Sequence, residues 1–505
     1  MDFLRRINNK VWFQLYVNLC LALFISLSSY IHVPLQSVKE YVIYTVHFVL
    51  LQMTLYGFTY LLTLNKWLFR LGFNLLFFIF SLISFWVYTL DITISVDLIQ
   101  LSLESKPDIF FDLLSFPFFL FVIVLLIVLY SINVFYSRLH FSFEKRTKGL
   151  FFSIIAIALF FFLEENKYGV FKRRMPYIVV CESVKYFNKV PLKFATIDQQ
   201  ISAKNKINIV FVLGESVRAK NLQLNGYARE TNPLLSKRKD VFSFSKIFTS
   251  NTYTSKSVPQ ILTSQSIYDK EFKNVYSMYS VFNKANINTV WIGNQTPEVS
   301  YRDLIFQNKK VNLIDVEHSV LSYHKKHDGE LLTIFKENYK NNYSNLYTIH
   351  MIGSHWWYEG RYPNQFKKYT PVVKTKYLPS NTKEEMINSY DNTIVYLDHF
   401  LNDIISFLEG KKDNTILIYL SDHGEILGED GKWLHAQDHI ESKNPACIVW
   451  ISEKFKENYP DKTNQLKKKI DSKITTDFLY NSVLDLVEIQ SFKYNRSKSI
   501  FSNNP

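Results

Sequence analysis

The first third of the chain is a series of long apolar segments, and they predict a domain inside a membrane. Phe, Leu and Ile dominate these segments, and short polar or charged stretches separate one from the next. A helix needs about 20 mostly apolar residues to cross a bilayer. Residues 1–164 therefore form a predicted domain of five membrane helices. We expect these helices at about residues 11–33, 41–64, 67–90, 115–136 and 149–163.

The charges between these segments predict how the chain crosses the membrane. Lys and Arg gather before the first segment, between the second and third, and between the fourth and fifth, whereas residues 91–114 carry five acidic residues and one lysine. Basic loops stay on the cytoplasmic side. We therefore expect the N-terminus in the cytoplasm of a bacterium, the helices in its inner membrane, and everything after the fifth helix in the periplasm.

From residue 206 to residue 505 the pattern changes, because short apolar runs alternate with longer helix-like segments. This alternation predicts a soluble α/β domain. Residues 165–205 connect the two predicted domains and mix Lys and Arg with Tyr, Phe and Val. That mixture is typical of a segment at a membrane surface, although an ordinary covered linker has the same composition.

Three apolar runs of the soluble domain end in residue types that bind metals. NIVFVLG is followed by Glu215, LYTIHMIGS by His355, and TILIYLS by Asp422 and His423. Ligands of open α/β sheets bind at the carboxyl ends of the strands. If the three strands are parallel neighbours, these side chains share one crevice. A carboxylate beside an imidazole suits zinc or another divalent cation.

Each of these residues has an ordinary structural explanation when it is taken alone. Glu215 could be an acid at the start of a helix, and His355 could be a hydrogen-bonded or exposed histidine. His435, in GEDGKWLH, is a weak signal by itself, as is a threonine in the hydroxyl-rich loop FTSNTYTSKSVPQILTS. A metal ion lowers the pKa of a bound hydroxyl, and a helix start favours a phosphate. Together, the metal-type residues form a set that chance explains far less well than any one of them, and they indicate a metal site that could activate a hydroxyl of this loop.

Net charge and cysteines exclude two other kinds of site. The net charge is +13, but the lysines are scattered and form no basic stripe between aromatic residues. We therefore expect a membrane surface, and no nucleic acid, as the partner of this charge. The three cysteines, Cys20, Cys181 and Cys447, have no CxxC spacing, which excludes a cysteine zinc site. A disulfide between Cys181 and Cys447 stays open.

Four motifs resemble those of the membrane phosphoethanolamine transferases, which modify lipid A or other envelope acceptors and include the mobile colistin-resistance enzymes. The motifs are GESVRAKNLQLNGYARETNPLL (214–235), TSNTYTSKSVP (249–259), GSH (353–355) and SDHGEILGEDGKWLH (421–435). With the membrane segments before them, they extend the resemblance over nearly the whole chain. The resemblance implies five membrane helices followed by a periplasmic domain of the alkaline phosphatase/sulfatase fold.

The resemblance also implies roles for single residues. Thr254 matches the nucleophile of the family, and Glu215, Asp422 and His423 match the residues that hold one zinc ion together with that threonine. His355 and His435 match residues that contact the phosphoryl group or hold a second zinc. The implied reaction moves phosphoethanolamine from phosphatidylethanolamine to Thr254, releases diacylglycerol, and then passes the group to an acceptor.

The sequence departs from the lipid A enzymes at several positions. Ser250 and Gln260 stand where those enzymes usually have a disulfide, and Trp356 and Trp357 replace a common Gly-Pro. WIGNQTPEVS resembles relatives that act on other acceptors, whereas LNGYARETNP resembles the lipid A group. We expect lipid A as the first acceptor. Lipid A that carries phosphoethanolamine should bind cationic peptides such as polymyxin more weakly.

Other acceptors and other functions stay open. A core sugar of lipooligosaccharide or another envelope component could take the group in place of lipid A. A phosphoglycerol transferase acting on an envelope glycan would have the same membrane anchor, metal and threonine. A non-catalytic, membrane-tethered relative is the alternative from another class.

Overall fold

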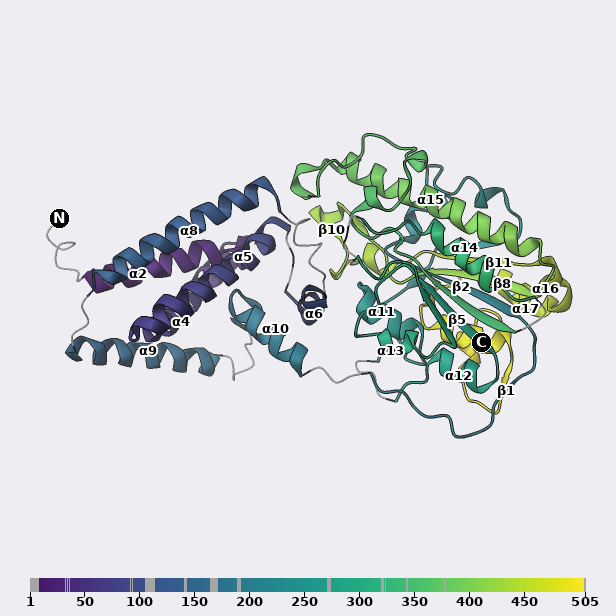
Figure 1. The fold of residues 1–505 in the computed structure, drawn as a ribbon, viewed down its shortest axis with the longest axis horizontal. Helices are drawn as coiled ribbons and strands as arrows, with labels where there is room; N and C mark the ends of the chain where they lie inside the picture. Colours follow the sequence, from purple (N-terminus) through teal and green to yellow (C-terminus); the bar gives the residue numbers. More distant parts are fainter. Residues whose placement is uncertain are drawn as a thin grey trace. The chain divides into compact units, whose positions relative to one another are not determined.

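The computed structural model describes most of the chain (Figure 1). The described residues are 9–31, 37–90, 94–104, 114–139, 143–163, 171–188, 192–269, 274–318, 324–341, 344–376 and 378–503, together with residues 33, 35, 92 and 322. The chain divides into two compact units, one mostly before residue 190 and one mostly after it. Much of the predicted acidic loop, including Asp108 and Asp112, lies outside the described residues.

The first unit is helical. Its helices are α2 (Asn9–Leu21), η1 (Ala22–Ser26), α3 (Ser28–Ile31), α4 (Val38–Thr63), η2 (Leu68–Phe73), α5 (Asn74–Leu90), α6 (Val96–Glu104), α8 (Phe116–Ser137), α9 (Phe143–Leu163) and α10 (Tyr177–Phe187). Among the described residues, three helices are long and apolar enough to cross a membrane: 38–63, 68–89 and 116–137. They match the second, third and fourth predicted segments. The fifth segment is a shorter apolar helix, Gly149–Phe162, so the predicted number of five stays an expectation.

The first predicted segment is not one regular helix. The π-helical turn η1 separates α2 from α3. Serine side chains bond to the main chain here: Ser28 Oγ donates to Ile25 O over 2.7 Å, and Ser84 Oγ donates to the same oxygen over 2.8 Å. Side chains that take part in the helical hydrogen-bond ladder bend or interrupt it. Hydrophobicity alone does not predict this break.

Apolar side chains on the outer surface of this unit fit a membrane. In α8, Ile127 is 62% exposed and Tyr130 is 73% exposed. The opposite side of the helix packs inside the unit, where Tyr136 stacks on Phe69 with ring centroids 4.1 Å apart. A helix that is apolar on all sides is typical of a membrane span.

The second unit is built on a seven-stranded sheet with the order β3-β11-β8-β2-β7-β5-β6. Its strands are β2 (Asn208–Gly214), β3 (Val241–Phe244), β5 (Asn288–Gly293), β6 (Lys310–Leu313), β7 (Asn345–His350), β8 (Thr415–Ser421) and β11 (Cys447–Ile451). The five strands from β8 to β6 are parallel, and β11 is antiparallel to both β8 and β3. The three strands predicted to carry the site are therefore parallel neighbours, in the order β8-β2-β7.

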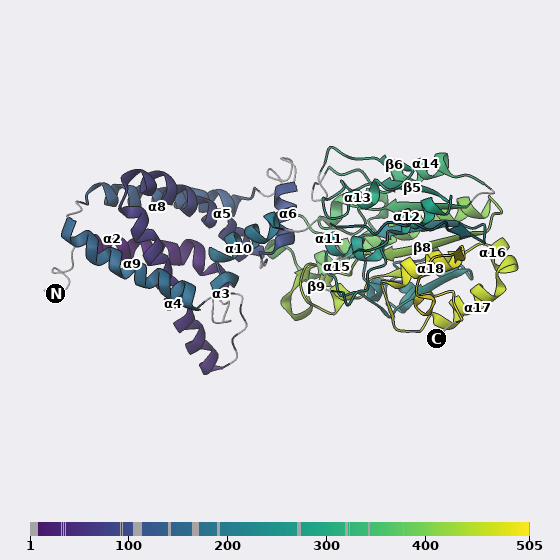
Figure 2. The same ribbon diagram turned by 90° about the horizontal axis from the view of Figure 1, so that it is seen from below.

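Helices cover both faces of this sheet. They are α11 (Thr254–Ile261), α12 (Met278–Lys284), α13 (Arg302–Ile305), α14 (Gly329–Asn338), α15 (Lys383–Glu409), α16 (Glu453–Asn458), α17 (Pro460–Lys469) and α18 (Phe478–Leu486). Alternate residues of a strand point to opposite faces. Ile209, Phe211 and Leu213 of β2 pack in one core with side chains of α11, α12 and α18. Helices α14 and α15 lie over the other face (Figures 1 and 2).

Three small two-stranded pairs complete the second unit. They are β1 (Ser202–Ala203) with β13 (Ile489–Gln490), β4 (Ile247–Phe248) with β12 (Ile474–Thr475), and β9 (Ile426–Leu427) with β10 (Trp433–Leu434). The last pair matters for the site, because it returns the chain after β8 to the carboxyl ends of the parallel strands. The β13 and β1 pair joins the two ends of the soluble unit.

Candidate active site

The residues predicted from the strand ends lie together at the carboxyl edge of the sheet. Glu215 follows β2, and Asp422 and His423 follow β8. The main chain connects these ends: Asp422 N donates to Gly214 O over 3.1 Å, and Ser354 N, in the loop after β7, donates to Glu215 O over 2.9 Å. The strand ends that were expected to line one crevice therefore lie side by side.

Thr254 is the first residue of α11, and it brings a hydroxyl into this crevice. Its Oγ1 donates a hydrogen bond of 2.8 Å to Oε2 of Glu215. The helix begins five residues before Pro259, so this proline lies in its second turn. The N–H groups at the start of a helix are free of helical partners and favour negative charge. Thr254 therefore stands where a phosphate group is stabilised.

Asp422, His423 and Glu215 form the buried centre of the cluster. His423 Nε2 lies 3.3 Å from Glu215 Oε1 and 3.3 Å from Asp422 Oδ2. All three residues are fully buried. Among the described residues, Asp422 Oδ2 and His423 Nε2 have no hydrogen-bond partner. Buried polar atoms are normally paired, so these two atoms are suited to bind a ligand that the protein itself does not supply.

Two carboxylates and an imidazole share this buried centre, and each shifts the pKa of the others. Burial raises the pKa of Asp422 above its usual range, and the neighbouring charge of Glu215 raises it further. Burial also acts to raise the pKa of Glu215, but the adjacent imidazole of His423 holds that pKa well below its ordinary value. Two buried carboxylates in contact cannot both ionise cheaply. A divalent cation removes this repulsion.

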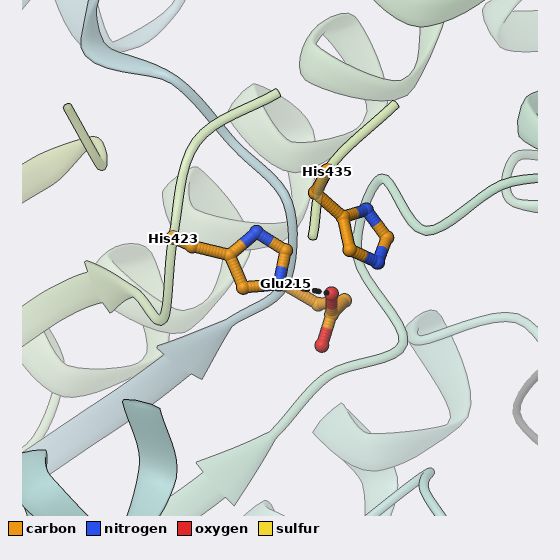
Figure 3. Close-up of side chains that lie close together, drawn as sticks. All are labelled: Glu215, His423 and His435. Atoms are coloured by element: carbon orange, nitrogen blue, oxygen red, sulfur yellow. Dashed lines mark ion pairs between the residues drawn. The ribbon is translucent and has the colours of Figure 1, made fainter. Parts of the chain in front are cut away.

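His435 reaches the same centre from the residue after β10. Glu215, His423 and His435 have ligand atoms that all lie within 4.8 Å of one another, and Figure 3 shows the three side chains converging from separate segments. His435 Nδ1 lies 3.0 Å from Glu425 Oε2, and Glu425 Oε1 accepts a 2.7 Å hydrogen bond from Tyr358. The carboxylate of Glu425 therefore fixes the ring of His435, as outer carboxylates do for metal-binding histidines.

His355 borders the cluster. Its ring centroid lies 5.4 Å from that of His435, and its Nδ1 donates to Trp356 O over 2.7 Å. Burial lowers the pKa of His355 to about 3. The buried guanidinium of Arg361 donates to His355 O and Trp356 O over 2.9 and 3.1 Å, which holds this loop in place. All six residues predicted from the sequence therefore lie in one region.

The donor atoms of this region fit a zinc ion. Imidazole nitrogen and carboxylate oxygen are common zinc ligands, and Thr254 adds a hydroxyl. The three residues whose ligand atoms lie within 4.8 Å of one another include His435 and not Asp422. The family resemblance instead assigns Asp422 to the first zinc ion, and His435 to the phosphoryl group or a second zinc ion. Asp422 Oδ2 is nonetheless unpaired and lies close to His423 Nε2.

Two residues of the region were not predicted as site residues. Glu425 belongs to SDHGE, and its position two residues after His423 is the available signal. Gln295, in WIGNQTPEVS, donates from Nε2 to Glu215 Oε2 over 3.2 Å. This stretch resembles relatives that act on other acceptors, but its sequence does not indicate a contact between Gln295 and Glu215.

Comparison with known proteins agrees with this architecture. The Sulfatase family matches residues 207–489. Phosphoethanolamine transferase EptA of Escherichia coli (strain K12) is 32% identical over 310 residues, which cover 59% of this chain and 56% of that protein. Phosphatidylethanolamine transferase Mcr-2 of Escherichia coli is 30% identical over 239 residues, which cover 45% of this chain and 44% of that protein. The chain thus spans about half the length of these relatives.

A solved structure has the same fold over the full length. The integral membrane protein lipooligosaccharide phosphoethanolamine transferase A (EptA) from Neisseria meningitidis superimposes with a TM-score of 0.81 and 22% identity, covering 97% of this chain and 98% of that one. This likeness confirms the predicted fold class, a helical membrane region followed by a sulfatase-type α/β domain. Because the family match extends over more than half of the chain, the chain belongs to the sulfatase family, and its relatives there are the phosphoethanolamine transferases that its motifs resemble.

Proposed function

We propose that this chain transfers phosphoethanolamine from phosphatidylethanolamine to an acceptor in the bacterial envelope. The observation that carries the proposal is the hydroxyl of Thr254, held 2.8 Å from Glu215 beside Asp422 and His423. The relatives named above support the transferred group and its lipid donor. Lipid A is the first acceptor, and a core sugar of lipooligosaccharide or another envelope component is the alternative.

The reaction has two halves, and Thr254 takes part in both. In the first half, Oγ1 of Thr254 attacks phosphorus, the bond from phosphorus to the glycerol oxygen breaks, and diacylglycerol leaves with the proton that Thr254 gives up. In the second half, an acceptor oxygen attacks the same phosphorus and Thr254 leaves, regaining a proton from the acceptor. Glu215 orients the hydroxyl through its hydrogen bond. A positioned nucleophile of this kind is the main requirement of phosphoryl transfer.

We further propose zinc as the metal. Glu215, Asp422, His423 and Thr254 would hold one ion, and His355 and His435 would contact the phosphoryl group or hold a second. Zinc, when bound, supplies positive charge that stabilises the charge developing on the phosphoryl oxygens. The unpaired Asp422 Oδ2 and His423 Nε2 support this assignment. His435, oriented by Glu425, is placed to donate a proton or hydrogen bond at the reacting group.

The membrane domain fits a lipid donor. We propose a multi-pass protein of the inner membrane with residues 1–164 in the bilayer, residues 165–205 at its surface and residues 206–505 in the periplasm. The basic loops between the apolar segments support a cytoplasmic N-terminus. Phosphatidylethanolamine and a lipid-linked acceptor are then both available in the membrane in which the chain is anchored.

The test is to capture the covalent intermediate. The full-length protein in detergent is incubated with phosphatidylethanolamine and no acceptor, and peptides are examined by mass spectrometry. We expect phosphoethanolamine on Thr254 and one diacylglycerol released per adduct. The Thr254→Val variant should give neither product. Phosphoglycerol on Thr254 with phosphatidylglycerol, and no adduct with phosphatidylethanolamine, would replace the proposal by a phosphoglycerol transferase; no adduct with either lipid would contradict a covalent mechanism.

A further inference from the structure

We propose that Gln295 is a positioning residue for Glu215, acting from the opposite side of strand β7. This inference rests on the metal site proposed above. Gln295 acts on that site through its contact with Glu215. Gln295 is 2% exposed. Its Nε2 donates to Glu215 Oε2 over 3.2 Å and to Met351 O over 2.7 Å.

The order of the strands explains why this contact needs a glutamine. Gln295 lies just after β5, and Glu215 lies just after β2, with β7 between the two strands. The side chain therefore crosses the carboxyl end of β7, and Met351 O, at that end, accepts one of its two amide N–H groups. The other N–H then points at Glu215. Asparagine, one methylene shorter, has less reach for the same crossing.

The loop that carries Gln295 is firmly held. Asn294 N donates to His350 O over 2.9 Å, and Asn294 Nδ2 donates to Asp328 Oδ1 over 2.9 Å. The same carboxylate accepts from Ile352 N and Gly353 N, each over 2.9 Å. Asp328 thus ties the loop after β5 to the loop after β7. A side chain anchored on such a base can hold its partner in a fixed orientation.

The hydrogen bonds of Glu215 show what Gln295 adds. Oε1 accepts from Ser216 Oγ over 2.8 Å and faces His423, whereas Oε2 accepts from Thr254 and from Gln295. Thr254 gives up its proton when it becomes bonded to phosphorus, so its hydrogen bond to Oε2 ends at that point. Of the donors to Oε2 in the described part of the chain, Gln295 then remains. It therefore holds Glu215 in its metal-binding orientation while the covalent group is present.

Gly353 limits the other movement that Glu215 could make. A Cβ atom at Gly353 would lie 2.7 Å from Glu215 O and 3.0 Å from Glu215 Cβ. The main chain of Glu215 is thus packed against the loop after β7 without space to shift toward it. With the backbone fixed in this way, the remaining freedom of Glu215 is rotation of its side chain, which is the motion that Gln295 restricts.

The experiment compares two buried glutamines in the full-length protein in detergent. Gln295→Met keeps the length of the side chain and removes its N–H groups. Gln265→Met is the control, because Gln265 is 4% exposed and donates to Asp269 O instead of Glu215. Metal-free samples are titrated with Zn²⁺ against a chelator of known affinity, and with Co²⁺ while the visible spectrum is recorded. We expect Gln295→Met to weaken zinc binding by about tenfold to a hundredfold, with the control like the wild type.

The Co²⁺ spectrum separates positioning from a general folding defect. At saturating Co²⁺, loss of positioning changes the shape of the absorption bands, whereas partial unfolding lowers the amount of bound Co²⁺ and leaves the shape of the bands unchanged. A changed shape in Gln295→Met alone supports the proposal. Unchanged zinc affinity, or an unchanged band shape at saturation, contradicts it and leaves the proposed function intact. A wild-type protein that binds neither metal contradicts the zinc site and the role of Gln295 together.

Discussion

The hydroxyl of Thr254 donates to Oε2 of Glu215 over 2.8 Å, which joins the start of α11 to the end of β2. The reacting group and the sheet edge are therefore positioned by one hydrogen bond between segments 39 residues apart in the sequence. Thr254 is 9% exposed, whereas Glu215 is fully buried.

Replacing Thr254 by valine tests its role as the nucleophile. Valine keeps the branched shape but has no oxygen, so covalent catalysis is lost. We expect the release of diacylglycerol from phosphatidylethanolamine to fall by at least about a thousandfold. The assay measures released diacylglycerol over time. Thr252→Val is the control, because Thr252 lies two residues earlier and is also buried; equal losses in the two variants would contradict a special role for Thr254.

Glu425→Gln tests how His435 is held. The carboxylate of Glu425 lies 3.0 Å from His435 Nδ1 and accepts a hydrogen bond from Tyr358. The amide of glutamine can present its NH₂ group to Nδ1 of His435, which favours the tautomer with its proton on Nε2 instead of Nδ1. We expect kcat to fall by about tenfold to a hundredfold, while the KM for phosphatidylethanolamine stays the same. Tyr358→Phe leaves the carboxylate beside His435 and should have a smaller effect. A loss confined to KM would contradict this role.

The strand ends were predictable from the sequence, but the contacts between them were not. Apolar runs ending in Glu215, Asp422 and His423 stand out in one sequence, because buried strands seldom end in such residues. The order β8-β2-β7 depends on the whole fold, so the sequence predicts a shared site only on the condition that the three strands are parallel neighbours. Gln295 acts across an intervening strand, so its partner is set by sheet order and not by local pattern.

Removal of the metal tests the charge balance of the site. Burial and the charge of Glu215 raise the pKa of Asp422 in the metal-free protein, so a bound divalent cation would favour the ionised form of this carboxyl and stabilise the folded state. We expect a chelator to abolish transfer and to lower the melting temperature, and zinc to restore both. A ligand at a hundred times its Kd stabilises the folded state by about 2.7 kcal/mol. The check is differential scanning fluorimetry alongside activity; a protein that is fully active after exhaustive chelation would contradict the metal mechanism.

The segment around Thr254 is held by hydrogen bonds at the two positions where the resemblance to lipid A enzymes leads one to expect a disulfide. Gln260 Oε1 accepts from Thr476 Oγ1 over 2.7 Å, and Ser250 Oγ donates to Ile267 O over 2.8 Å. No disulfide joins Cys20, Cys181 or Cys447 in this structure, so the Cys181–Cys447 bridge that stayed open is not formed here. Stability of the soluble domain should therefore be the same with and without a reducing agent.

Gln260→Leu measures what the polar replacement contributes. Leucine is close to glutamine in size, but it leaves the buried hydroxyl of Thr476 without its acceptor, and an unpaired buried group costs about 1–3 kcal/mol. We expect the free energy of unfolding in urea to fall by that amount, and the double variant Gln260→Leu with Thr476→Val to recover part of it, since both polar partners are then gone. Additive losses in the double variant would contradict a direct interaction between the two side chains. Transfer activity at a temperature well below the unfolding transition should persist, because Gln260 supports helix α11, which begins at Thr254, from its other end.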